Sequence, residues 1–218
     1  MRIYHISDSH CLHRHLIVPD ADIVIHSGDF ADSRNSGVSC IQVANFIEWF
    51  SQLPIKHKVV VAGNHDIAIE RGMYGRSTFT DNNINYLENS GVTIEGLNIY
   101  GSPYTPSFGV GWAFNKSRGS IGLLWENIPQ DTNILVTHGP PKTILDFNDE
   151  LEPVGCKVLF NTVMKLPNLK LHCFGHVHNN KNIINTGLRI FNGRTFSNGS
   201  IVKDGSYEIV GNGNIINV

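Results

Sequence analysis

The sequence predicts an α/β fold of four layers, in which two mixed β-sheets face each other and helices flank them on the two outer sides. Three observations favour this α/β/β/α sandwich: short apolar runs, helical segments between them, and turn signals in the last third of the chain. Five runs are apolar almost throughout and rich in β-branched residues, which is typical of strands covered on both faces. They lie at 2–7, 22–27, 58–62, 133–137 and 169–174.

Two segments between the strands have the spacing of helices. Apolar residues recur every three or four positions in 39–53, so they share one face of a helix. Ser39 is the expected cap at its start, and Pro54 is expected to end it. The segment 154–165 has a similar apolar face and predicts a second helix.

Turn signals predict hairpins in the rest of the chain. Glu95-Gly96 separates two short apolar runs and indicates a tight turn between strands. Four Asn-Gly or Asp-Gly pairs predict antiparallel hairpins that close the second sheet. These pairs are Asn192-Gly193, Asn198-Gly199, Asp204-Gly205 and Asn212-Gly213. Since no repeat or linker divides the chain, we expect one domain over residues 1–218.

Composition excludes several classes of protein. The 218 residues are 41% hydrophobic and carry a formal net charge of −2, so the chain lacks the basic surface that long nucleic acids require. No run of 18 apolar residues predicts a membrane span, and the residues after Met1 do not resemble a secretory signal. The four cysteines show no metal-binding or disulfide spacing. We therefore expect a cytoplasmic protein with reduced thiols.

Five polar clusters, each directly after one of the apolar runs, are the most informative feature of the sequence. They combine carboxylates, an amide and imidazoles, which together form the ligand set of a transition-metal site. The clusters are Asp8-Ser9-His10, Gly28-Asp29, Gly63-Asn64-His65-Asp66, His138-Gly139 and Gly175-His176-Val177-His178.

The positions of the clusters predict that they form one site. The carboxyl ends of parallel strands meet at one edge of a sheet, and residues two apart, such as His176 and His178, can point the same way. Two cations held by such ligands can clamp a displacement at phosphorus. The sequence therefore indicates a two-metal centre that hydrolyses phosphoesters. Taken alone, Asp8 and His10 are more often capping or surface residues, whereas Gly63-Asn64-His65-Asp66 is a stronger signal. His176 and His178 are also a stronger signal, although they could be a satisfied pair of histidines.

At these residues the chain resembles the calcineurin-like metallophosphoesterases, whose pattern of Asp-x-His, Gly-Asp, Gly-Asn-His-Asp/Glu, His and Gly-His-x-His it matches from residue 8 to residue 178. It is most similar to the metallophosphoesterase-domain branch known from brain proteins. Shared-looking stretches begin at Lys58, Tyr100, Gly111, Thr137 and Val154. Some members of that branch have glycine in place of the histidine found here at position 176, which weakens their second metal.

The resemblance implies a role for each motif residue. Asp8, His10 and His178 are expected to hold the first metal. Asn64, His138 and His176 are expected to hold the second, with Asp29 as the bridge. The two catalytic residues are then His65, which contacts the phosphate together with Asn64 and assists the leaving group, and Asp66, which orients His65.

The expected activity is hydrolysis of a small phosphodiester, a cyclic or other nucleotide, by a hydroxide that bridges two divalent ions. The mixed oxygen and nitrogen ligands favour Mn²⁺, with Fe or Zn²⁺ as alternatives. A phosphomonoesterase acting on nucleotides or phosphoproteins is the second hypothesis. A non-enzymatic nucleotide-binding or scaffold protein is the third, and its mark would be lost ligands, of which the sequence shows none.

Several other residues are candidates for substrate contact. His13 closely follows the first cluster, and Asn115 and Arg118 follow Trp112 in a glycine-rich region where an aromatic ring and a guanidinium could hold a base or a phosphate. Core packing is an equally good interpretation of that region. Asp32 is expected to cap a helix. Three histidines inside predicted strands are expected to pack or hydrogen-bond rather than bind metal: His5, His26 and His172.

Overall fold

The computed structural model describes residues 1–181, 183–206 and 208–218, and two large sheets dominate it. The first sheet has the strand order β13-β1-β2-β3-β4 and the second has the order β11-β12-β10-β9-β6-β5. The first consists of β1 (Arg2–Ile6), β2 (Ile23–His26), β3 (His57–Val60), β4 (Asn85–Tyr86) and β13 (Asn214–Asn217). The second consists of β5 (Ser90–Ile94), β6 (Leu97–Ser102), β9 (Ile134–Thr137), β10 (Leu171–Phe174), β11 (Gly187–Phe191) and β12 (Arg194–Asn198).

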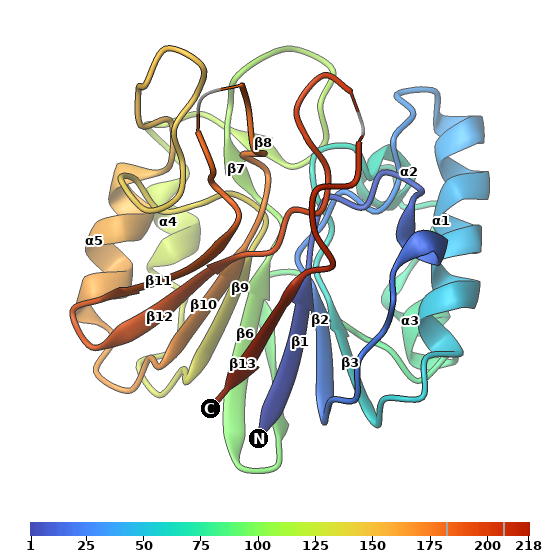
Figure 1. Ribbon diagram of the computed structural model, residues 1–218, viewed down its shortest axis with the longest axis horizontal. Coiled ribbons are helices and arrows are strands. Elements are labelled where there is room, and N and C mark those ends of the chain that lie inside the picture. Colours follow the sequence, from blue (N-terminus) through green and yellow to red (C-terminus); the bar gives the residue numbers. More distant parts are fainter. Residues whose placement is uncertain (182, 207) are drawn as a thin grey trace.

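The inner strands of both sheets are parallel, so their carboxyl ends lie at one edge of the molecule. In the first sheet β1, β2, β3 and β4 are parallel, and β13 runs antiparallel beside β1. In the second sheet β6, β9, β10 and β12 are parallel, and only the edge strands β5 and β11 are antiparallel. The loops that follow these strands gather at the top of Figure 1.

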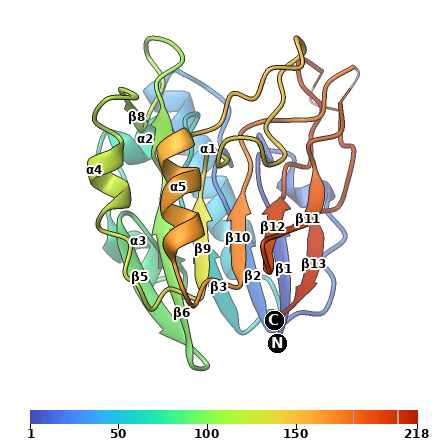
Figure 2. The same ribbon diagram turned by 90° about the vertical axis from the view of Figure 1, so that its left-hand side faces the viewer.

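Helices cover the outer face of each sheet, which confirms the predicted four layers (Figures 1 and 2). On the first sheet lie α1 (Ser36–Ser51), α2 (Ile67–Glu70) and α3 (Arg76–Thr80). On the second lie α4 (Gly122–Trp125) and α5 (Lys157–Lys165). The remaining short elements are the 3₁₀ turn η1 (His13–His15) and the strand pair β7 (Thr105–Pro106) and β8 (Asn115–Lys116). In the described part of the chain, no helix has the length and apolarity to cross a membrane.

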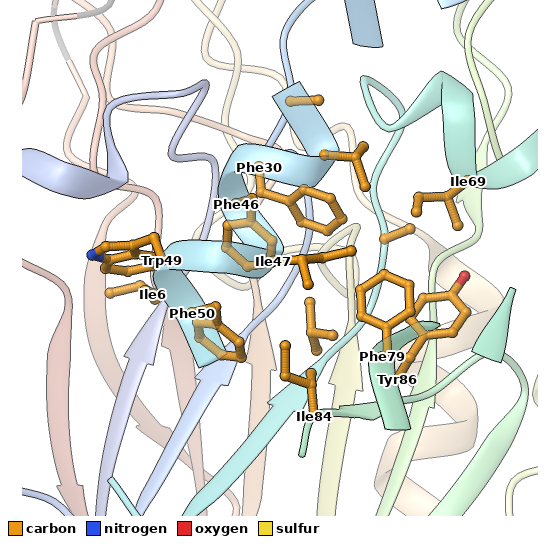
Figure 3. Packing of buried hydrophobic residues seen from close by; sticks show 14 of the residues in the cluster. Ile6, Phe30, Phe46, Ile47, Trp49, Phe50, Ile69, Phe79, Ile84 and Tyr86 are labelled. Carbon is orange, nitrogen blue, oxygen red and sulfur yellow. The ribbon is translucent and has the colours of Figure 1, made fainter. Parts of the chain in front are cut away.

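Alternation along the strands produces three hydrophobic layers. Side chains such as Ile25 and Val136 fill the space between the sheets, whereas their neighbours in sequence point outward under the helices. Beneath α1 the rings of Phe30 and Phe46 stack with centroids 4.1 Å apart, and Phe50 extends the stack (Figure 3). This packing holds the strands, and therefore the loops at their ends, in fixed positions.

Two helix starts differ from the sequence prediction. Helix α1 begins three residues earlier than expected, and Asn35, not Ser39, caps it by accepting hydrogen bonds from the backbone of Gly37 and Val38. Ser39 is buried inside the helix and its hydroxyl accepts from the backbone nitrogen of Ala68. Helix α5 begins at Lys157 rather than at residue 154.

The hairpin predictions are correct for three turns and wrong for the other two. Glu95-Gly96 joins β5 to β6, and Asn192-Gly193 joins β11 to β12. Asp204-Gly205 turns a short hairpin in which Val202 pairs antiparallel with Ile209, and the backbone N–H of Lys203 donates to Glu208. Asn198 instead ends β12, and Gly213 leads into β13. The last strand then joins the first sheet beside β1 rather than closing the second, because its partners are residues 2–5.

Candidate metal centre

The five polar clusters meet where the strands of both sheets end. Nε2 of His138, after β9, lies 2.9 Å from Oδ1 of Asn64, after β3, and 3.2 Å from Oδ2 of Asp29, after β2. Nε2 of His178, after β10, lies 3.1 Å from Oδ1 of Asp8, after β1. Residues separated by up to 170 positions are thus in contact. The clusters form one site, as the sequence predicts, but they come from the edges of two sheets rather than one.

Asp8, His10 and His178 form one compact group, with a ligand atom from each lying within 4.8 Å of the others. The protein itself positions Asp8, since its carboxylate accepts the backbone N–H of His176 at 2.9 Å and the hydroxyl of Ser200 at 2.6 Å. These bonds fix the carboxylate before any cation arrives, which is the arrangement expected of a prepared metal ligand.

Asp29, His138 and His176 form a second group with the same compactness. Nδ1 of His138 lies 2.9 Å from the backbone oxygen of Ser27, which can only accept, so Nδ1 must carry a proton. Nε2 of the same ring faces two further oxygen atoms, from Asn64 and Asp29. Such a cluster of acceptors needs a positive charge among them, either a second proton on His138 or a metal ion. The residues present therefore fit a cation.

Burial and charge shift the pKa values of these groups. Burial by itself lowers the pKa of His138, but the Asp29 carboxylate outweighs burial and raises this pKa to about 9. Burial would raise the pKa of Asp8, but His178 outweighs burial and holds the pKa well below its usual range. Burial lowers the pKa of His176 to about 3, so this ring is neutral at pH 7 and able to bind a metal.

The backbone is strained at four of the candidate ligands. Asp8, His10, Asp29 and His176 have φ values of 51°, 39°, 56° and 69°. Residues with a Cβ rarely adopt this left-handed region, and such strain is concentrated at functional sites because the surrounding structure must enforce it. Here it turns each side chain from the end of its strand toward the common centre.

Two glycines make this close approach possible. Gly28 has a φ of +104°, and a Cβ there would lie 2.6 Å from Nδ1 of His138. A Cβ at Gly175 would lie 2.0 Å from Oδ2 of Asp8. Any larger residue at either position would displace a candidate ligand.

Comparison with known proteins identifies the family. The model of the calcineurin-like phosphoesterase family matches residues 1–180. The chain belongs to the calcineurin-like phosphoesterase family. It is 34% identical over 210 residues to the human metallophosphoesterase domain-containing protein 1, covering 85% of this chain and 63% of that protein. It is also 34% identical over 205 residues to a UPF0046 protein of Caenorhabditis elegans, covering 88% of this chain and 68% of the relative.

Within this calcineurin-like site, His65 lies beside the first group. Its ring centroid is 4.6 Å from that of His10, and its Nδ1 lies 2.8 Å from the backbone oxygen of Asp32. The Asp32 carboxylate lies 3.4 Å from Nδ1 of His10 and 3.6 Å from Nδ1 of His65. Asp32 is therefore not the helix cap that the sequence suggests but a partner of two site histidines.

The resemblance implies that Asp66 contacts His65, but the Asp66 carboxylate binds backbone N–H groups instead. The two oxygens of Asp66 accept the backbone N–H groups of Gly63, Asp29 and Ala31 at 2.7–2.9 Å. Asp66 is fully buried and ties the loop after β3 to the loop after β2. Its role is to hold two ligand-bearing loops together, while Asp32 orients His65.

Two segments with bulky side chains border the centre, and we call them the rim loops: residues 106–118 and 140–155. In the first, the ring of Trp112 lies 4.6 Å from that of His65, and Phe108 lies 5.0 Å from His176. The guanidinium of Arg34 lies 3.7 Å above the Trp112 ring. Sequence reasoning missed Arg34 because no motif surrounds it, although it follows Asp29 by only five residues.

The three remaining substrate-contact candidates have structural partners. His13 is fully buried against Phe46 and Trp49, and its Nε2 lies 3.0 Å from Asn45, so its prediction as a substrate contact is wrong. Asn115 holds the rim loop through the backbone of Ala113 and Phe108. Arg118 donates to the carbonyls of Val154 and Gly155, which joins the two rim loops.

The strand histidines lie in the interior, as expected. His5 bridges the hydroxyls of Ser197 and Ser27 between the sheets, and His172 contacts Thr137. Nε2 of His26 lies 3.0 Å from the hydroxyl of Ser9, and its Nδ1 accepts the backbone N–H of Gly28. This ring therefore links the first polar cluster to the second.

Proposed function

We propose that the protein is a two-metal phosphodiesterase whose substrate is a small phosphodiester. The observation that carries this proposal is the convergence of two compact ligand groups beside His65. In this proposal Asp8, His10 and His178 hold one divalent ion. Asn64, His138 and His176 hold the other, and Asp29 bridges the pair. The chain spans 63% of the human relative, so the activity is proposed for the residues described here.

The oxygen and nitrogen donors fit Mn²⁺ best, with Fe or Zn²⁺ as alternatives, since no thiolate is among them. Such a pair of ions, when bound, supplies a hydroxide at neutral pH and neutralises the phosphate oxygens. The neutral amide of Asn64 lowers the negative charge of the ligand set, which favours an anionic substrate.

His65 is proposed as the proton donor to the leaving oxygen. Its Nδ1 must carry a proton, because the backbone oxygen of Asp32 beside it only accepts. Nε2 is then the atom that gives up or takes a proton during the reaction. The Asp32 carboxylate lies 3.6 Å from the same Nδ1 and helps to hold the ring in this orientation.

A diester is favoured over a monoester because a cavity for a second substituent adjoins the centre. It measures about 470 Å³ and includes His176 and His178 in its lining. A diester can place the substituent that stays on phosphorus in this space while its leaving group departs beside His65. The phosphomonoesterase is the second candidate, and retention of every motif residue disfavours a scaffold role.

The test is a substrate panel with protein stripped of metal and reloaded with Mn²⁺. The panel contains bis-p-nitrophenyl phosphate, 2′,3′- and 3′,5′-cyclic nucleotides, nucleoside monophosphates and a phosphopeptide. We expect turnover of diesters to exceed that of monoesters and to require added metal. Faster turnover of monoesters would favour the phosphomonoesterase.

A substitution tests the bridging role. We expect Asp29→Asn to lower turnover of the diester by at least about 10³-fold, since several kcal/mol of charge stabilisation are lost. Asp81→Asn, at an exposed aspartate after α3, is the matched control. Undiminished turnover by Asp29→Asn would contradict the assignment.

A further inference from the structure

The cavity beside the metal centre has a composition that the hydrolysis of a phosphate does not explain. Both rim loops and the segment after β10 line it, and His176 and His178 form the part nearest the candidate ligands. His65 is not among its lining residues. The cavity is therefore placed to hold the substituent that stays on phosphorus, while the leaving group departs beside His65.

One wall of the cavity is apolar and aromatic. Phe108 comes from the first rim loop and Phe147 from the second, and Pro106, Pro140 and Val154 also line the cavity. The ring of Phe108 is half exposed and lies 5.0 Å from the His176 ring, so an aromatic face lies directly beside a candidate ligand. An aromatic face attracts both apolar groups and organic cations.

The rest of the lining carries more negative than positive charge. It contains the carboxylates of Asp149, Glu150 and Asp204 and a single cationic side chain, Arg118. The guanidinium of Arg118 is tied to the carbonyls of Val154 and Gly155 at 2.8 and 3.3 Å. Two further lysines, Lys181 and Lys203, do not line this cavity but line an adjoining hollow together with Asp149 and Asp204.

None of the three carboxylates is held in a direct ion pair with a described residue. Among the residues that the structure describes, no ion pair involves any of them. Glu150 accepts one hydrogen bond from the Asn148 amide, which leaves its charge in place. A second phosphate in the cavity would be repelled, whereas a positive group would be attracted by the carboxylates and by the ring faces.

We propose that this cavity binds a positively charged organic group, an ammonium or quaternary ammonium, on the retained alcohol of the phosphodiester. The substrate is then zwitterionic, with its phosphate at the metal centre and its cation between Phe108 and the three carboxylates. This inference rests on the proposed phosphodiesterase function and specifies its substrate class. In the reaction, the oxygen of water bonds to phosphorus, and the bond from phosphorus to the leaving oxygen breaks with both electrons on that oxygen. One proton of the water passes to the leaving oxygen or to solvent, and the cationic alcohol remains esterified.

Two esters with the same leaving group test the proposal in Mn²⁺-loaded protein. One is p-nitrophenyl phosphorylcholine, and the other is p-nitrophenyl 3,3-dimethylbutyl phosphate, in which carbon replaces the charged nitrogen at equal shape. We expect kcat/KM for the cationic ester to be about tenfold higher, in the range of a cation held by aromatic faces. We also expect the ratio to fall as salt is added, because the carboxylates are exposed to solvent.

Substitutions show which side chains cause the difference in kcat/KM between the cationic and the neutral ester. The triple variant Asp149→Asn, Glu150→Gln, Asp204→Asn is expected to reduce the ratio to about one, and Phe108→Leu is expected to reduce it partly. Glu126→Gln removes an exposed carboxylate after α4, outside the cavity, and is expected to leave the ratio unchanged. Thermal melting of each variant shows that it is folded.

Failure of this inference can be told apart from failure of the proposed function. If both esters are hydrolysed equally, or if the triple variant keeps the ratio, the cation site is contradicted and the phosphodiesterase stands. If neither ester is hydrolysed, the phosphodiesterase proposal fails. Calorimetry then compares binding of phosphocholine with that of 3,3-dimethylbutyl phosphate, and equal affinities overturn the cation site itself.

Discussion

The loops that carry the candidate ligands and the rim loops lie side by side but are built differently. The ligand loops are buried, and their carboxylates accept backbone N–H groups: Asp8 accepts from His176 and Asp29 from His65. The rim loops expose large side chains, with Val110 95% and Leu151 64% exposed. The candidate metal centre is thus held from within, and under the proposed function the exposed rim loops select the substrate.

Because of this difference, we expect substitutions in the two regions to change different properties of the protein. Changes in the ligand loops should affect the chemical step or the stability of the fold, because each side chain there has several partners. Changes in the rim loops should affect substrate affinity, since the side chains there contact solvent on one side.

The largest effect is expected for His65→Ala. Loss of a proton donor beside the leaving group should lower kcat by about 10²- to 10⁴-fold. Binding of two Mn²⁺ ions should persist, because His65 is not among the proposed ligands. His15→Ala, at an exposed histidine of η1, is the control. An unchanged kcat would remove His65 from the chemistry.

The next largest effect is expected for Asp66→Ala, and it concerns stability. The substitution leaves three buried backbone N–H groups without an acceptor, at about 1–3 kcal/mol each. We expect the free energy of unfolding to fall by about 3 kcal/mol or more in metal-free protein, measured by urea titration. Asp66→Asn keeps one acceptor oxygen and should cost less. Equal stability of wild type and Asp66→Ala would show that the two loops do not depend on this contact.

Acid should destabilise the interior beneath the ligand loops. Burial lowers the pKa of His5 and His172 to about 3 and that of His13 to about 4, so these rings are neutral in the folded protein. The unfolded chain takes up protons as pH falls below about 6.5, and each ring then costs about 1.4 kcal/mol per pH unit until its folded pKa is reached.

This prediction is checked by urea midpoints of chelated protein at pH 7 and pH 5. The raised pKa of His138 adds stability that is already complete below pH 6.5, so it does not mask the loss. The lowered pKa of Asp8 preserves its contribution until the pH falls below about 4. A midpoint that is constant from pH 7 to pH 5 would contradict the account of neutral buried histidines.

The smallest effect is expected in the rim. Trp112→Leu removes the ring that lies between His65 and the Arg34 guanidinium, and we expect KM for bis-p-nitrophenyl phosphate to rise about tenfold with little change in kcat. Val110→Ala, on the same loop and almost fully exposed, should leave both constants unchanged. A larger fall in kcat than rise in KM would mean that the rim also positions the reacting groups.

The sequence reveals the ligand loops because each motif follows an apolar run, and strand ends converge by simple geometry. The sequence does not reveal contacts that depend on the backbone conformation of the loops after the strands. Asp32 lies beside His10 and His65 after a left-handed turn at Asp29, and Arg34 contacts the site through the ring of Trp112. His13 looks like a site residue in sequence, yet the turn η1 directs it into the core.

The ends of elements were also hard to predict. Ser39 has the chemistry of a cap, but Asn35 precedes it and caps α1 first, so the hydroxyl of Ser39 bonds to α2 instead. The Asn-Gly and Asp-Gly pairs mark turns without specifying which strands they join. The pairing of β13 with β1 is a contact between the two ends of the chain, where the amino group of Met1 donates to Val218.

The most direct test of the two-metal centre is the number of Mn²⁺ ions bound per chain, measured by metal analysis after dialysis against limiting free metal. We predict two ions for the wild-type protein, with one lost in His176→Ala and the other retained by Asp8, His10 and His178. Binding of fewer than two ions by the wild type, or of two by His176→Ala, would contradict the assignment of the two ligand groups.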